Sequence, residues 1–143
     1  MINTGLFTSN TDEWETPQDV FDKLNDEFHF TLDVCATKEN AKCDKYFTKE
    51  ENGLSQDWEG ETVWCNPPYG RSIKYWVWKC LLHSIGGGVA VMLIPARTDT
   101  KWFHEYIYGQ PYAKIRFVRG RLKFGGSKWN APFPSMVVVF SRT

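Results

Sequence analysis

Apolar residues recur along this chain with two different periods, which together predict an alternation of strands and helices. Unbroken apolar runs predict buried strands, at residues 62–65, 89–94 and 134–140. Apolar positions three and four residues apart predict helices, near residues 17–28, 72–85 and 100–108. A first strand is expected within 30–36, and 46–47 could add a short one. This alternation is typical of an α/β fold, and the run at 89–94 suits a parallel sheet covered on both faces.

Polar residues at the expected helix ends support these elements. Thr16 is expected to cap the first helix, with Pro17 at its first position and Asp19 where a capping-box acid would lie. Ser72 is expected to cap the second helix, and Gly86 opens a glycine run that suits its C-terminal end. The residues alone support capping at Thr16 and Pro17; a ligand role there needs separate evidence.

Basic and apolar residues alternate over 113–124, which predicts two strands that meet near Gly120. The cations of such a pair would be free to contact phosphates, namely Lys114, Arg116, Arg119, Arg121 and Lys123. The next stretch, 125–130, is expected to be a flexible loop.

Length and composition then limit the class of protein. The 143 residues are expected to form a single domain, in which 1–12 lack periodicity and form a mobile arm. No apolar run reaches the roughly 20 residues of a membrane helix, and no secretory signal is present, so a cytoplasmic protein without membrane contact is expected. Seven Trp exceed the needs of so small a core, and some are expected on a binding surface.

The four cysteines, Cys35, Cys43, Cys65 and Cys80, show no C-x-x-C spacing. This spacing argues against a zinc site. Reduced structural thiols in a cytoplasm are the expected state.

Charge is divided unevenly along a chain whose formal net charge is zero. Residues 1–66 hold 15 Asp and Glu against 5 Lys and Arg, whereas residues 67–143 hold 2 against 12. This division suggests a polyanion such as nucleic acid as the partner of the second half, although a solvated basic face is the alternative.

The most informative stretch is Asn66-Pro67-Pro68-Tyr69, directly after the strand at 62–65. A strand that ends in this way presents a carboxamide oxygen, a carbonyl that precedes a proline nitrogen, and an aromatic ring at one sheet edge. Asn66 and the Pro67 carbonyl could accept the two N–H bonds of an exocyclic amino group while Tyr69 stacks on its ring. The alternative is a Pro-Pro turn that ends a core strand, with Tyr69 merely packed.

Further candidates lie near the same edge. Asp33 ends the first strand, where an acid of an open α/β sheet faces the ligand crevice and could bind an ammonium or hydroxyl group. Asn40 is a candidate ligand contact, and Asp57 with Trp58 offers an acceptor beside a flat apolar wall. The alternatives are a turn-forming Asp33, and a buried Trp58 beside a solvated Asp57. No dinucleotide-binding glycine motif follows the first strand.

Taken in order, several short stretches carry a family likeness: Glu15-Thr16-Pro17, residues 32–36, 46–48, 64–70, 95–100, 119–124 and 131–135. Together they resemble the small phage-type DNA N6-adenine methyltransferases (the phage Dam family) across most of the chain. The resemblance implies a reduced Rossmann-like methyltransferase sheet, mostly parallel with an antiparallel C-terminal hairpin. It also implies S-adenosylmethionine as cofactor without a metal, double-stranded DNA as partner, and a phage or prophage origin in a bacterial host.

The same resemblance implies roles for individual residues. The catalytic set would be Asn66, Pro67, Pro68 and Tyr69. Cofactor binding would involve Thr16, Pro17, Asp33, Ala36, Asn40, Asp57, Trp58 and Asn66, with Asp57 and Trp58 beside the cofactor adenine. DNA binding would involve Arg97, Lys101, Arg119, Arg121, Lys123, Phe124 and Lys128, with Phe124 as a second wall against a flipped-out base.

The chain departs from the family pattern in three respects. Residues 34–37 replace the usual glycine-rich loop after the first strand. About 30 residues separate Asp33 from Asn66, too few for two intervening strand–helix units. These 143 residues leave no room for a separate target-recognition domain, so none is expected within them, and the acid for the cofactor ribose is assigned only provisionally, to Glu50 or Glu51.

Three functions remain open from the residues. The first is methyl transfer to adenine N6 in DNA. The second is methyl transfer to an RNA base or to a glutamine side chain of a protein, whose amino group would be bound by the same two acceptors. The third is a non-catalytic nucleic-acid-binding module. So short a chain could also require a homodimer to span its site.

Overall fold

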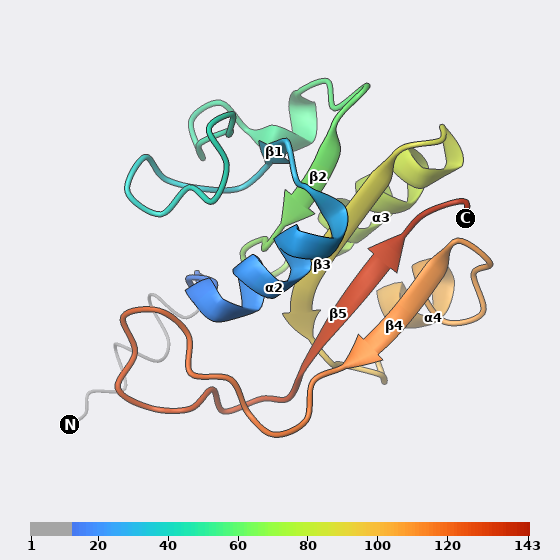
Figure 1. The fold of residues 1–143 in the computed structure, drawn as a ribbon. Helices are drawn as coiled ribbons and strands as arrows, with labels where there is room; N and C mark the ends of the chain where they lie inside the picture. Colours follow the sequence, from blue (N-terminus) through green and yellow to red (C-terminus); the bar gives the residue numbers. More distant parts are fainter. Residues whose placement is uncertain (1–12) are drawn as a thin grey trace.

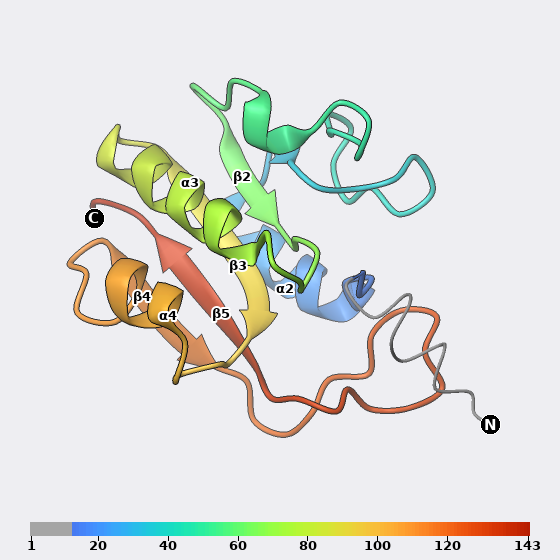
Figure 2. The same cartoon turned by 180° about the vertical axis from the view of Figure 1, so that it is seen from behind.

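The computed structural model describes residues 13–143, so the arm expected at 1–12 lies outside the described residues. In chain order the elements are helix α2 (Gln18–Phe28), strand β1 (Leu32–Asp33), the 3-10 helix η1 (Gly53–Ser55), β2 (Thr62–Cys65), α3 (Ile73–Ile85), β3 (Val89–Pro95), α4 (Lys101–Tyr106), β4 (Ala113–Phe117) and β5 (Ser135–Phe140). A five-stranded sheet forms the middle layer. Helix α2 covers one face, and α3 and α4 cover the other (Figures 1 and 2).

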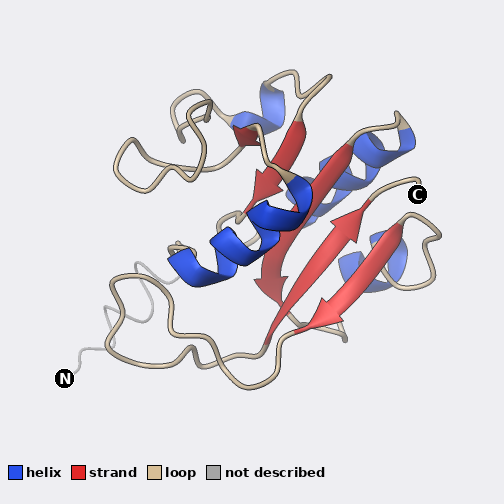
Figure 3. Ribbon diagram, in the orientation of Figure 1, coloured by secondary structure: helices blue, strands red, loops and turns tan. Residues whose placement is uncertain are grey.

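The strands lie in the order β1-β2-β3-β5-β4. β1, β2 and β3 pair in parallel, whereas β5 is antiparallel to both β3 and β4. Four strands therefore run in one direction and β5 runs in the other (Figure 3). This arrangement confirms the predicted α/β fold with its mostly parallel sheet and antiparallel C-terminal hairpin, which is formed by β4 and β5.

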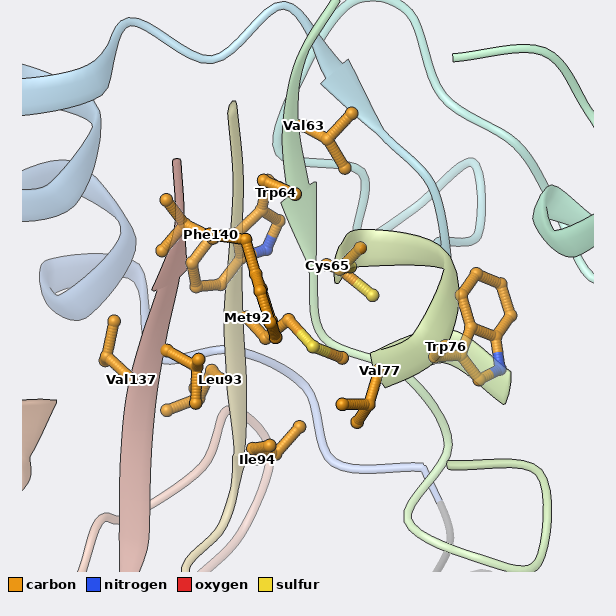
Figure 4. Close-up of a cluster of buried hydrophobic side chains, with 14 of the residues drawn as sticks. Val63, Trp64, Cys65, Trp76, Val77, Met92, Leu93, Ile94, Val137 and Phe140 are labelled. Atoms are coloured by element: carbon orange, nitrogen blue, oxygen red, sulfur yellow. The ribbon is translucent and has the colours of Figure 1, made fainter. Parts of the chain in front are cut away.

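The core is built on β2, β3 and β5, which are apolar because helices or loops cover both faces of the sheet. All six residues of β5 are buried. Successive side chains of β2 point to opposite faces: Trp64 meets Phe21 of α2, with ring centroids 5.4 Å apart, and Cys65 points toward Val77 of α3 (Figure 4). Unbroken apolar runs in the sequence therefore correspond to strands with two buried faces.

Helix α2 begins one residue later than predicted, and the predicted cap at Thr16 is wrong. Pro17 occupies the N-cap position without a side-chain cap hydrogen bond. The Thr16 hydroxyl instead accepts a hydrogen bond from Asn66 Nδ2 at 2.9 Å. Ser72 does lie at the N-cap of α3, although its side chain makes no cap hydrogen bond, and Gly86 lies at the C-cap as predicted.

The second of the two strands predicted around Gly120 does not form. β4 ends at Phe117, and residues 118–134 form a loop that leads into β5. Gly120 has φ +75, which turns the chain away from the strand direction. The loop is fixed by hydrogen bonds from Ala131 N to Leu122 O (2.7 Å) and from Gly125 N to Glu15 O (2.9 Å). Alternating basic and apolar residues here reflect a folded loop.

Two cations of the same stretch are engaged within the protein. Arg116 donates to both carboxylate oxygens of Glu27, at 2.8 and 2.7 Å. Lys114 Nζ donates to the Thr143 carbonyl at 3.0 Å. The expectation that both are free to contact phosphates is therefore wrong.

The connection between β1 and β2 contains η1 and a β-bridge between Asp33 and Tyr46, and no further strand–helix unit. This confirms the expectation from the short separation of Asp33 and Asn66. β1 has only two residues, and it is held by Asp33 N to Lys45 O (3.0 Å) and Phe47 N to Asp33 O (2.9 Å).

All four cysteines are free thiols. None of the helices within 13–143 has the length and apolar character that a bilayer crossing requires.

Gly53 allows the β1–β2 connection to pack against the first strand. A Cβ at this position would lie 2.1 Å from the Val34 carbonyl oxygen, closer than atoms can approach. We expect Gly53→Ala to lower the free energy of unfolding by about 1–3 kcal/mol or more, because backbone must move to make room. Urea unfolding followed by circular dichroism measures this.

Gly86→Ala is the matched control for Gly53→Ala. Its Cβ would meet no neighbour closer than 3.6 Å, and its φ of −77 suits any residue. Equal stability of the two variants would contradict the close approach at Gly53.

Candidate functional site

The carboxyl ends of the parallel strands meet at one sheet edge, and the candidate residues gather there. Asp33 ends β1, Asn66 follows β2 directly, and Ala96 follows β3. The 118–134 loop also reaches this edge, beside the segment that precedes α2 (Figures 1 and 2). Ligands of open α/β sheets bind at such an edge.

The Asn66 side chain is held by three hydrogen bonds. Its Nδ2 donates to the Trp14 carbonyl (2.5 Å) and to Thr16 Oγ1 (2.9 Å). Its Oδ1 accepts from the Tyr69 hydroxyl (2.5 Å). Because a backbone carbonyl can only accept, the Trp14 contact fixes which end of the carboxamide is the NH2 group. Oδ1 therefore faces the opposite side and keeps a second lone pair.

Pro67 and Pro68 continue the chain from this point and prevent the strand from extending. The Pro67 carbonyl accepts no hydrogen bond from any residue within 13–143. The strand tip thus carries two oxygen acceptors in sequence, Asn66 Oδ1 with one lone pair left and the Pro67 carbonyl.

Tyr69 is placed differently from the expectation of an open stacking face. Its side chain is 6% exposed, and its hydroxyl lies 2.8 Å from the Leu93 carbonyl as well as 2.5 Å from Asn66 Oδ1. The hydroxyl proton can serve only one of these acceptors at a time. In this conformation Tyr69 supports Asn66 rather than presenting its face.

Four aromatic rings form a closed cluster beside the tip: Trp14, Tyr69, Phe124 and Phe133. Tyr69 meets Phe124 and Phe133 edge-to-face, with centroids 6.2 and 5.6 Å apart. Trp14 meets the same two rings at 5.5 and 5.1 Å. Phe124 therefore lies next to Tyr69, as expected of a second wall, but the two rings are in contact and leave no slot between them.

A cavity of about 580 Å³ opens at this edge, within the roughly 300–1,000 Å³ typical of ligand pockets. Most of the residues predicted for catalysis and cofactor binding line this cavity: Thr16, Asp33, Ala36, Asn40, Asn66, Pro67 and Pro68. Pro17 is buried and is not part of the lining, and Tyr69 lies behind Asn66.

Asp33 is the buried acid of the cavity. Its oxygens accept hydrogen bonds from the backbone of Cys35 (3.2 Å) and Lys42 (3.0 Å), which fold the following loop around the cavity. Burial raises the pKa of the Asp33 carboxyl from 3.8 to about 6, although these hydrogen bonds and the Lys42 charge lower it. Each oxygen retains a lone pair for a ligand.

The neighbouring thiol shares this environment. Burial, together with the nearby charges of Asp33 and Glu13, raises the pKa of Cys35 to about 12. Cys35 lines the cavity and stays protonated at neutral pH.

Asn40 acts first on its own loop. Its Oδ1 accepts from Thr37 N at 2.7 Å, and its backbone N–H donates to Thr37 Oγ1 at 3.1 Å. This turn holds one wall of the cavity in place.

The structure does not bring Asp57 and Trp58 to this cavity. They lie beside a second groove, at the opposite end of the sheet near Val89. Trp58 is buried, and its Nε1 donates to the Gly53 carbonyl at 2.9 Å. The alternative interpretation of a packed Trp58 beside a solvated Asp57 therefore holds.

The provisional ribose acids are also separated from the cavity lining. Glu51 Oε1 accepts from the backbone and hydroxyl of Thr48, at 2.9 and 3.2 Å, and so serves a turn. Glu50 is exposed. The acids that line the cavity are Glu13, Glu15 and Asp33.

Sequence reasoning missed the far wall of the cavity, which is formed by residues 48–49 and 52–54 with Trp64 and Trp76. The available signal was Asn52-Gly53, a turn dipeptide in which Asn52 has φ 57 and caps η1 through its side chain. Periodicity marked Trp64 and Trp76 as core residues, and each also exposes an edge to the cavity.

The predicted DNA-binding cations are exposed: Arg97, Lys101, Arg119, Arg121, Lys123 and Lys128. Lys101 contacts Glu105 at 3.6 Å. The other five form no ion pair with any residue from 13 to 143. Four of the six belong to the 118–134 loop, which contacts Glu15 beside the cavity through Gly125.

Among the described side chains, no three His, Cys, Asp or Glu residues are grouped as metal ligands.

Comparison with known proteins gives one consistent result. A family model described as DNA N-6-adenine-methyltransferase (Dam) matches residues 3–142. The chain is 35% identical over 106 residues to the DNA N-6-adenine-methyltransferase of Haemophilus phage HP1, which covers 72% of this chain and 61% of that protein. It is also 35% identical over 96 residues to the DNA N-6-adenine-methyltransferase of Escherichia phage T1, covering 66% of this chain and 40% of the relative. The chain thus spans less than two thirds of the length of either relative.

Proposed function

The chain belongs to the DNA N-6-adenine-methyltransferase (Dam) family, and from this premise we propose that it transfers a methyl group from S-adenosylmethionine to N6 of an adenine in double-stranded DNA. The observation that carries the proposal is the fixed Asn66 carboxamide beside the free Pro67 carbonyl, on the wall of a cavity of about 580 Å³.

The cavity residues fit the cofactor chemically. Asp33 offers a buried carboxylate with unused lone pairs to the ammonium of the methionine part. Trp64 and Trp76 give flat apolar edges against which a purine can pack, and the turn at Asn40 gives polar groups. When bound, S-adenosylmethionine supplies a methyl group already activated by its sulfonium, so no metal is required for that activation.

Asn66 and Pro67 would act on the amino group that receives the methyl. The N6 nitrogen of adenine is a poor nucleophile because its lone pair is delocalised into the ring. Accepting its two N–H bonds at Asn66 Oδ1 and the Pro67 carbonyl favours a pyramidal nitrogen and stabilises the positive charge that develops there. The bonds from Asn66 Nδ2 to Trp14 and Thr16 keep the carboxamide oriented before substrate arrives.

The aromatic cluster must open for the reaction. An adenine inside a duplex cannot reach the tip, so it is flipped out at a cost of a few kcal/mol. Because Tyr69 and Phe124 are in contact, stacking a base on Tyr69 requires the 118–134 loop to move. Asn66 Oδ1 keeps one lone pair beside its bond from Tyr69, and that lone pair can accept an N–H bond of the base.

Double-stranded DNA fits the cations around this edge. The loop that covers the strand tip carries four exposed cations, which could hold the phosphates that flank the flipped base: Arg119, Arg121, Lys123 and Lys128.

Both relatives are phage proteins, which supports a bacterial cytoplasm as the working location.

Transfer of tritiated methyl from S-adenosylmethionine to DNA, RNA and total protein tests the proposal. Label in DNA adenine is the expected result. Label in RNA or in protein glutamine would favour those substrates instead. No label, together with no cofactor binding, would favour a non-catalytic nucleic-acid-binding module.

We expect Asn66→Ala to reduce methyl transfer by roughly 100–1000-fold, the loss typical of removing one preorganised contact to developing charge, or about 2.7–4 kcal/mol. Cofactor affinity should change little, because other residues form most of the cavity. Single-turnover rates and calorimetric titration measure the two quantities.

Asn40→Ala is the contrasting variant for Asn66→Ala. It loosens the turn at Thr37 and should weaken cofactor binding while leaving the rate at saturating cofactor near wild type. Near wild-type turnover in Asn66→Ala would refute the role given to Asn66.

We expect cofactor affinity to increase as pH rises from 5 to 7 and then to level off. A cation bound at Asp33 requires the carboxylate, and the pKa of about 6 means that the free site binds a proton at lower pH. Affinity should therefore fall by up to tenfold per pH unit below about 6. Titration calorimetry across this range measures the slope.

Asp33→Asn should bind the cofactor weakly and with a flat pH profile, because the amide does not titrate. A slope in Asp33→Asn equal to that of the wild type would assign the titration to another group.

We expect DNA affinity to fall steeply with salt, and the slope of log affinity against log salt to decrease by about two when Arg119 and Arg121 are both changed to Gln. Fluorescence anisotropy of a labelled duplex measures this. The matched control is the double variant Lys114→Gln with Arg142→Gln. It removes two charges near Thr143 and Gly87, at the end of the strands that lies away from the cavity. If the control pair changes the slope instead, DNA binds elsewhere.

A further inference from the structure

Helix α3 carries an apolar stripe on its solvent side. Tyr75, Trp78, Leu82 and Ile85 follow one another at spacings of three, four and three residues, and they are between 43% and 53% exposed. The other side of the helix packs into the core through Trp76, Val77, Cys80, Leu81 and Ser84. The helix lies on the outside of the sheet, in front of β3 in Figure 2. Contiguous exposed apolar side chains of this kind mark an interaction surface.

A fixed groove of about 970 Å³ runs beside this stripe, with residues 54–62 as its other wall. Lys79 Nζ holds that wall by donating to the Leu54 and Gln56 carbonyls, at 2.8 and 2.5 Å. His83 Nε2 lies 2.9 Å from the Glu61 carbonyl. The groove is thus built from anchored main chain.

Charges of opposite sign lie at the two ends of the stripe. Arg71 and Lys74 are exposed at the start of α3. Asp57 and Glu59 are exposed on the wall beside its second half, where Trp58 contacts His83 with ring centroids 5.9 Å apart. None of these four charged residues forms an ion pair within the described part of the chain.

We propose that this stripe is the contact surface between two copies of the chain, paired through antiparallel α3 helices about a two-fold axis. The three-four-three spacing is that of a helix–helix seam. Antiparallel pairing sets Tyr75 of one copy against Ile85 of the other, and Trp78 against Leu82, and the two-fold axis repeats each contact. It also sets the basic start of each helix against the acidic wall of the other copy.

The charge pattern argues for a second copy over DNA. A polyanion along this groove would meet Asp57 and Glu59, which repel it, whereas a second copy offers Arg71 and Lys74 to the same acids. The surface is therefore complementary to itself. Large aromatic side chains at its centre are also typical of interface cores.

Sedimentation equilibrium of the wild-type chain tests the pairing. The expected result is reversible association from 16.6 kDa to twice that mass. Trp78→Glu should raise the dissociation constant by roughly 30-fold or more, as for a central aromatic residue of an interface. Trp129→Glu is the matched control, because Trp129 is 67% exposed on the 118–134 loop, and it should leave the association unchanged.

Charge reversal tests the antiparallel arrangement. Arg71→Glu with Lys74→Glu, and separately Asp57→Lys with Glu59→Lys, should each weaken self-association by about tenfold or more, since both place like charges opposite each other. Mixing the two variants should restore the pairing as a heterodimer, because the acidic helix start of the first variant then meets the basic wall of the second, while the unchanged start of the second meets the unchanged acidic wall of the first.

A wild-type chain that stays at 16.6 kDa overturns the proposal. So does a dimer that survives Trp78→Glu, or two charge-reversed variants that fail to pair when mixed. Circular dichroism of each variant separates loss of pairing from loss of fold. None of these outcomes depends on methyl transfer.

Discussion

The hydrogen bonds of Asn66 connect segments that are far apart in sequence. Its NH2 group reaches the main chain of Trp14 and the hydroxyl of Thr16, 52 and 50 residues away, and its oxygen reaches Tyr69, which in turn contacts Leu93 of β3. The part-buried position raises the cost of breaking any one bond, since an unpaired polar group there loses its partner without gaining water. The strand tip is therefore oriented by the fold itself, as preorganised catalysis requires.

Local patterns predicted the elements whose environment is uniform. β2, β3 and α3 followed from apolar periodicity, because both faces of these strands are covered and one face of the helix is buried. The antiparallel C-terminal hairpin was implied by the family resemblance. Candidate residues at the carboxyl end of a strand, such as Asp33 and Asn66, come together on one cavity as expected. Sheet topology alone brings such residues together.

The remaining features depend on contacts between distant residues, which no local pattern contains. Thr16 stands where a helix cap is expected, but its hydroxyl accepts a hydrogen bond from Asn66, which follows β2 and is 50 residues away. The alternating pattern near Gly120 resembles a strand, but the loop finds its partner in Glu15. Nothing in the sequence around Trp58 distinguishes a residue that lines a ligand site from a packed core residue. Its hydrogen bond to the Gly53 carbonyl shows that it is packed in the core.

The protonated state of Cys35 has a chemical consequence if the cavity holds a methyl sulfonium, as proposed. A thiolate is a far better nucleophile than an aromatic amine, so an ionised cysteine on the cavity wall would compete for the methyl group and inactivate its own protein. The pKa of about 12, set by burial and by the charges of Asp33 and Glu13, keeps this sulfur unreactive. Asp33, the acid proposed to bind the cofactor, thereby also helps to protect the Cys35 thiol from methylation by that cofactor.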